Sequence, residues 1–135
     1  NKVFSLLEKG NSFQDLLNYK RLIVEKIKKL VKDKNYKKIY IFSKSFFGIA
    51  TAKILLDLGY PVKGFFDNSK ILSVNYKSKL KVFSPNGLIK KSKKELFKLF
   101  FIISNQQKRD VRSITAQLKK YNIRTKQITN INFSK

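Results

Sequence analysis

The residues with the clearest chemical pattern follow a short apolar segment and have the spacing of a dinucleotide-binding turn. In the pattern G-x-G-x-x-G the first glycine forms the turn, the second lets a pyrophosphate approach, and the third lets the helix pack on the strand. Here the three positions are Ser43, Ser45 and Gly48, so only the third glycine is present. Serine is small and its hydroxyl can donate to phosphate, and Lys44 adds a positive charge where a helix N-terminus already favours anions.

An acidic residue stands where a ribose-binding carboxylate is expected. Asp67 lies 19 positions after Gly48 and directly follows an apolar segment, and the usual separation in a dinucleotide-binding unit is about 20 residues. Ser104 and Asn105 end a later apolar run and are expected to face the same crevice. The predicted contacts to a nucleotide or another anionic small molecule are therefore Ser43, Lys44, Ser45, Gly48, Asp67, Ser104 and Asn105.

Six of these residues, all except Lys44, also have a structural role that their positions allow. Ser43 or Ser45 can cap the helix expected at 46–58. Gly48 can serve only the packing of that helix, Asp67 can be a turn residue, and a Ser-Asn pair is an ordinary strand ending. The sequence leaves both interpretations open at these positions.

The elements that must position these residues alternate between strands and helices. Near-continuous apolar runs are typical of strands buried on both faces of a parallel sheet, and four strands are expected at 39–42, 62–66, 99–103 and 124–131. Helices are expected at 46–58, 88–98 and 110–121, whereas 69–84 is interpreted as an excursion with at most a short extended piece. The predicted fold is α/β, a small Rossmann-like domain of three layers with strand order 2-1-3-4. Its topological switch point lies between the first and third strands.

An N-terminal helical extension, residues 1–35, is expected to precede the Rossmann-like domain, residues 36–135. Apolar residues recur at steps of three and four from Phe13 to Val31, which indicates an amphipathic helix starting at Ser12. Its apolar stripe predicts packing on the domain's own sheet, on a partner domain, or on a second copy through helix 13–32.

The net charge of +23 is the strongest compositional feature. It is consistent with a polyanionic partner such as nucleic acid or an anionic membrane surface. However, the chain has 27 lysines and only 4 arginines, and arginine is the residue that usually binds phosphates and bases. Lysine, asparagine, isoleucine and phenylalanine have A/T-rich codons, so a low-GC genome also explains this composition.

Several classes of site and of protein are not expected. The chain has no Cys and no His, and its eight acidic residues form no paired carboxylates, so neither a metal site nor a catalytic constellation is predicted. No apolar run approaches 18 residues, so no membrane span is expected. There is no signal-peptide pattern, which favours the cytoplasm, and the start at Asn1 leaves open that the chain is a piece of a longer protein.

Residues 37–131 resemble the small Rossmann-like domains attached to sugar-modifying enzymes, such as the C-terminal domain of sugar C-methyltransferases and the N-terminal domain of sugar acyltransferases. The resemblance is carried by KKIYIFSKSFFGIATAKILLDLGYPVKGFFDNS and by the later VFSPNGL. It implies binding of a nucleotide or nucleotide-sugar in cell-surface carbohydrate biosynthesis, without catalysis by this domain alone. A degenerate interaction module that docks a partner domain, and a nucleic-acid binder driven by positive charge, are the alternative functions.

Overall fold

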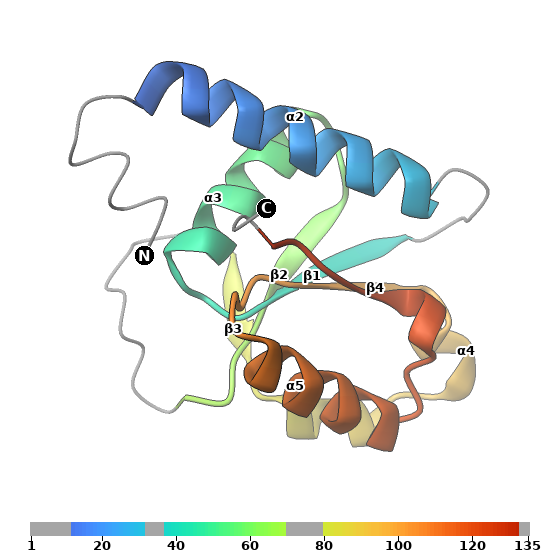
Figure 1. Cartoon of the computed structure of the whole chain (residues 1–135). Helices are drawn as coiled ribbons and strands as arrows, with labels where there is room; N and C mark the ends of the chain where they lie inside the picture. Colours follow the sequence, from blue (N-terminus) through green and yellow to red (C-terminus); the bar gives the residue numbers. More distant parts are fainter. Residues whose placement is uncertain (1–11, 32–36, 70–79, 133–135) are drawn as a thin grey trace.

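The computed structural model describes residues 12–31, 37–69 and 80–132, which form a three-layer α/β domain of the Rossmann-like class (Figure 1). The middle layer is a five-stranded sheet of order β3-β2-β1-β4-β5, in which all neighbouring strands are parallel. The strands are β1 (Lys38–Phe42), β2 (Val62–Phe66), β3 (Lys81–Phe83), β4 (Leu99–Ile103) and β5 (Ile128–Asn130).

The predicted strand order is confirmed, but the sheet has one strand more than the four expected. The predicted strands occur in the order β2-β1-β4-β5. The additional strand, β3, pairs with the second half of β2 at the edge of the sheet, where Gly64 lies opposite Lys81 and Phe66 opposite Phe83. It lies within the segment interpreted as an excursion, and its three residues are too few for a recognisable strand pattern.

Alternate residues of the central strands point to opposite faces of the sheet and build two separate cores. Ile39 and Ile41 of β1 belong to one core, whereas Tyr40 and Phe42 belong to the other. All five residues of β4 are buried. The sheet is therefore covered on both faces, as the continuous apolar runs predict.

Helices α2 (Ser12–Val31) and α3 (Phe46–Asp57) cover the first face (Figure 1). Because α3 connects β1 to β2, it lies over that half of the sheet, and the half that contains β4 needs a second helix. Ile23 of α2 is 0% exposed and belongs to the same core as Phe100 and Ile102 of β4. Ile23, one residue of the predicted apolar stripe, thus packs on the domain's own sheet.

The second face is covered by η1 (Pro85–Lys90), α4 (Lys93–Leu96) and α5 (Lys108–Lys120). The prediction of one helix at 88–98 is wrong: a 3-10 helix and a single-turn α-helix replace it. Pro85 at the first position starts the 3-10 helix. Ser92 starts the second helix, because its hydroxyl accepts from the N–H of Glu95 while the Glu95 carboxylate accepts from the N–H of Ser92.

Two helices are followed by residues with a left-handed backbone. Gly59 follows α3 with φ of 86°, and Asn122 follows α5 with φ of 68°, a left-handed conformation that glycine and asparagine tolerate best. The predicted strand at 124–131 is shorter than expected, since η2 (Thr125–Gln127) takes its first half and β5 begins at Ile128. Among the described helices, none is long and apolar enough to cross a membrane.

Candidate functional site

The predicted turn links β1 directly to α3. Ser45 is the N-cap of α3, with an extended backbone (φ −116°, ψ 179°), and its Oγ accepts a hydrogen bond from the N–H of Gly48 at 3.2 Å. The N–H of Ser45 donates to the carbonyl oxygen of Ser43 at 3.1 Å, which tightens the turn. The capping role that the sequence left open therefore belongs to Ser45.

The end of β4 is tied to this turn by side-chain hydrogen bonds. The N–H of Ser43 donates to Oγ of Ser104 at 3.2 Å, and Oγ of Ser43 donates to Oδ1 of Asn105 at 3.0 Å. Oγ of Ser104 also lies 3.3 Å from Oγ of Ser45. Ser104 is 1% exposed, so the switch point between β1 and β4 is filled by the protein's own polar groups.

Gly48 brings the first turn of α3 against the chain that leaves β1. A Cβ at this position would overlap with the carbonyl oxygen of Ser43 and would lie 3.0 Å from Oγ of Ser104. The residue must therefore lack a side chain for the helix to approach the turn this closely. This is the packing role of the third glycine in a dinucleotide-binding motif.

Asp67 joins the end of β2 to the same turn. Its Oδ2 accepts from the N–H of Lys44 at 3.0 Å, and its Oδ1 accepts from the N–H of Ser69 at 2.9 Å. The turn role left open by the sequence is therefore fulfilled. Each carboxylate oxygen has two lone pairs, so the same carboxylate can accept a further hydrogen bond from a ligand hydroxyl.

A hollow of about 440 Å³ opens beside Asp67, at the carboxyl ends of β2 and β3. This volume lies within the range of small-molecule sites, roughly 300 to 1,000 Å³. One wall consists of Asp67, Asn68 and Ser69, and the other consists of residues 82–86. The hollow thus combines a carboxylate, an amide and hydroxyls with the apolar surfaces of valine, phenylalanine and proline.

The second wall of this hollow was not predicted as part of a site. Sequence reasoning did not place 81–83 in the sheet, although the turn signal Ser84-Pro85 after a short β-forming run could have suggested a strand end there. Contacts from α5 and from Tyr121, the residue that follows it, connect to both walls. Tyr121 donates to Oδ1 of Asn86 at 2.8 Å, and the side-chain amides of Asn68 and Gln117 exchange hydrogen bonds of 3.0 and 2.9 Å.

All seven predicted residues lie in one connected network at the carboxyl edge of the sheet. Six of them, residues 43–45, Gly48, Ser104 and Asn105, surround the filled switch point. Of the seven, Asp67 alone lines the hollow. The structure therefore brings the predicted residues together but places the open volume on the outer side of Asp67, toward β3.

Within the part of the chain that the structure describes, no cluster of three acidic side chains is suited to holding a metal ion. No protein family model matches the chain, and no curated protein matches it.

Proposed function

We propose that this chain is a binding domain for a nucleotide or nucleotide-sugar, in a pathway that modifies cell-surface sugars, and that it is not catalytic on its own. One observation carries the proposal: the hollow beside Asp67, at the end of β2, where a ribose-binding carboxylate is expected. In open parallel α/β sheets, ligands bind outside the carboxyl ends of the strands. The assignment to a sugar pathway rests on the resemblance of residues 37–131 to domains attached to sugar-modifying enzymes.

The chemistry of the lining suggests how such a ligand would lie. Asp67 would accept a hydrogen bond from a sugar hydroxyl, and Val82 and Pro85 would contact the apolar faces of a base or sugar ring. The phosphates would extend toward Lys44 and the start of α3, because positive charge and the helix dipole favour anions there.

The net charge of +23 supports binding of an anion but does not distinguish one anion from another. Attraction between exposed charges is screened at distances beyond about 8 Å at physiological ionic strength. A specific nucleotide complex should therefore persist at physiological salt, whereas attraction to the overall charge should weaken strongly.

Isothermal titration calorimetry with nucleoside diphosphates and nucleoside-diphosphate sugars tests the proposal, with inorganic pyrophosphate as the reference anion. We expect at least one nucleotide to bind about tenfold more tightly than pyrophosphate at physiological salt. Asp67→Asn should weaken that nucleotide at least about tenfold, the effect of losing a hydrogen bond to a charged group. Asp57→Asn is the matched control, because Asp57 is exposed at the end of α3 and the charge change is the same.

Two outcomes of this titration would contradict the proposal. If no nucleotide binds more tightly than pyrophosphate, the chain responds to negative charge alone. If Asp67→Asn and Asp57→Asn have equal effects on nucleotide affinity, the ligand does not contact the carboxylate at the end of β2.

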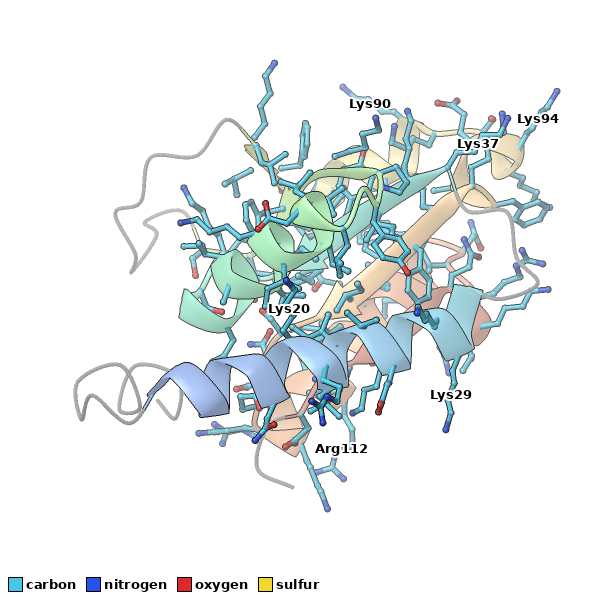
Figure 2. All side chains as sticks on the ribbon, turned by 90° about the horizontal axis from the view of Figure 1, so that it is seen from above. Lys20, Lys29, Lys37, Lys90, Lys94 and Arg112 are labelled. Carbon is cyan, nitrogen blue, oxygen red and sulfur yellow. The ribbon has the colours of Figure 1, made fainter. Side chains whose placement is uncertain are left out.

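The two alternative functions have less support. Ile23 is used by the domain's own core, which removes it from a docking stripe on helix 13–32. Nucleic-acid binding requires cations gathered along one face. In Figure 2 the labelled basic side chains come from several elements and project to different sides of the molecule, with Lys90 and Arg112 at opposite edges.

A further inference from the structure

A second hollow, of about 390 Å³, lies on the face of the sheet opposite α2 and α3, and the function proposed above does not use it. Three aromatic residues from neighbouring strands line it: Tyr40 of β1, Phe66 of β2 and Phe83 of β3. Ser84, Gly87 and Lys91 complete the lining. It shares Phe83 and Ser84 with the first hollow, so the two lie on either side of the corner between β3 and η1.

This hollow exists because the connection between β3 and β4 carries little helix. Only the six residues of η1 and the four of α4 are helical there, so no long crossover helix covers this end of the face. Gly64 in β2 leaves room for the ring of Phe83, which forms one wall of the hollow. A Cβ on Gly64 would lie 2.8 Å from Cε2 of Phe83, so the phenylalanine ring occupies the space that a side chain would fill.

The aromatic walls are fixed by their packing. The ring of Tyr40 is stacked on Phe101 with centroids 6.0 Å apart. It lies edge-on to Phe66 at 5.0 Å and to Phe83 at 6.0 Å. These are favourable arrangements for aromatic pairs. Because Tyr40 belongs to the central strand β1 and its ring packs on Phe66, Phe83 and Phe101, this wall of the hollow is formed by the protein's own core.

The hydroxyl of Tyr40 is the polar group that a ligand in this hollow would contact. The residue is only 7% exposed, and none of the described residues forms a hydrogen bond with this hydroxyl. Buried tyrosine hydroxyls normally have a partner. In the described residues, no fully buried side-chain polar atom lacks one, so the phenol oxygen must keep some contact with solvent, and the hollow that Tyr40 lines provides it. Burial raises the pKa of Tyr40, so the phenol is a neutral donor at pH 7.

Lys91 gives the hollow a positive charge. Its ammonium lies 4.0 Å from Oε2 of Glu95, a loose pair that contributes little. Hydrogen bonds from the backbone and the side chain of Ser92 lower the pKa of Glu95 and hold this carboxylate at the start of α4. Among the described residues that line the hollow none is acidic, so the charge of Lys91 faces an anion bound there without a competing carboxylate in the lining.

We propose that this second hollow binds a flat aromatic ring that carries a carboxylate or a similar acidic group. The ring would lie against Phe66 and Phe83. The acidic group would accept a hydrogen bond from the phenol of Tyr40 and would pair with Lys91. This site does not depend on nucleotide binding at the first hollow.

Titration of the full, ¹⁵N-labelled chain with 2-naphthoate, followed by NMR, tests the site. Amide shifts should concentrate at Tyr40, Phe66, Phe83 and Lys91, and the neutral analogue 2-naphthamide should bind at least fivefold more weakly. Tyr40→Phe keeps the ring and removes only the hydroxyl, so it should weaken naphthoate about tenfold.

Charge variants keep the test decisive if Tyr40→Phe does not fold. Lys91→Gln should weaken naphthoate about threefold, the scale of a partly exposed ion pair, and should leave naphthamide unchanged. Lys119→Gln, at an exposed position of α5, removes the same charge and should have no effect. Shifts spread over the lysine-rich surface, or equal naphthoate affinity in the two lysine variants, would overturn the site. Asp67→Asn should not alter naphthoate binding, which separates this proposal from the nucleotide site.

Discussion

The substitution Gly48→Ala should disrupt the turn on which the candidate nucleotide site depends. The new methyl group would overlap with the carbonyl oxygen of Ser43 and would lie 3.0 Å from Oγ of Ser104. The first atom is main chain and cannot rotate away. The second belongs to a side chain that is almost fully buried and accepts a hydrogen bond from the N–H of Ser43. Either α3 must move outward or the turn must deform.

The expected loss of stability is about 2 to 3 kcal/mol. Overpacking in a close-packed region costs about 1 to 3 kcal/mol. Moving the turn also weakens hydrogen bonds of Ser43 and Ser104, each contributing about 0.5 to 1.5 kcal/mol. Alanine is favoured over glycine in a helix by about 1 kcal/mol, which offsets part of this loss.

Urea unfolding followed by circular dichroism measures this difference, and Gly87→Ala is the matched control. A Cβ on Gly87 would meet no atom within 4 Å, so this variant should be as stable as the parent chain or slightly more stable. A Gly48→Ala variant that loses less than about 1 kcal/mol, with an unchanged m-value, would refute the close contact between α3 and the turn.

Two further predictions concern the sheet's two cores. Ile23→Ala should lower the free energy of unfolding by about 2 to 5 kcal/mol, because it leaves a cavity between α2 and β4. The control Ile89→Ala, at a residue 72% exposed, should change the free energy of unfolding by less than about 0.5 kcal/mol. Equal effects would show that α2 does not stabilise the domain. Because burial raises the pKa of Tyr40 above 10.0, the unfolded chain loses this proton first as the pH rises, so the folded state loses stability above about pH 10. Tyr40→Phe should remove the part of this stability loss that comes from the Tyr40 hydroxyl. If the free energies of unfolding of Tyr40→Phe and the parent chain run parallel between pH 9 and 11, the prediction is wrong.

The central part of the fold could be predicted because its signals are local. The runs at 39–42 and 99–103 are apolar at every position, which is typical of strands covered on both faces, and 62–66 is apolar at three of its five positions. The strand β3 could not be predicted in the same way. It has three residues, and its pairing depends on Gly64, where a Cβ would lie 2.8 Å from the carbonyl oxygen of Lys81. The close approach of these two strands involves residues that are distant in the sequence, so no local pattern reveals it.

Strand order could predict that the seven residues lie together at the sheet edge, but not their hydrogen-bond partners or the second wall of the hollow, residues 82–86. Strand order alone brings Ser43 and Ser104 to neighbouring positions on the sheet edge. Whether they face a ligand or each other depends on side-chain orientation, and in the structure they bond to each other. The open volume consequently lies beside Asp67, against a wall that β3 and η1 supply.

Ser43 and Ser45 stand at the two missing glycine positions, and the N–H groups of this turn are used by the protein itself. In a glycine-rich turn, backbone N–H groups are available to a pyrophosphate. Here four of them already donate within the protein. Ser43 donates to Ser104, Lys44 to the carboxylate of Asp67, Ser45 to the carbonyl oxygen of Ser43, and Gly48 to Ser45. The protein's own carboxylate therefore occupies a donor that a phosphate would otherwise use.

Asp67→Asn should consequently act in different directions on two probes. A nucleotide should bind more weakly, because an acceptor for its sugar hydroxyl is weakened. Pyrophosphate should bind at least as tightly as before, because one negative charge beside the N–H of Lys44 is gone. If both probes bind more weakly, the carboxylate acts only by holding the turn together, and the nucleotide proposal loses its central contact.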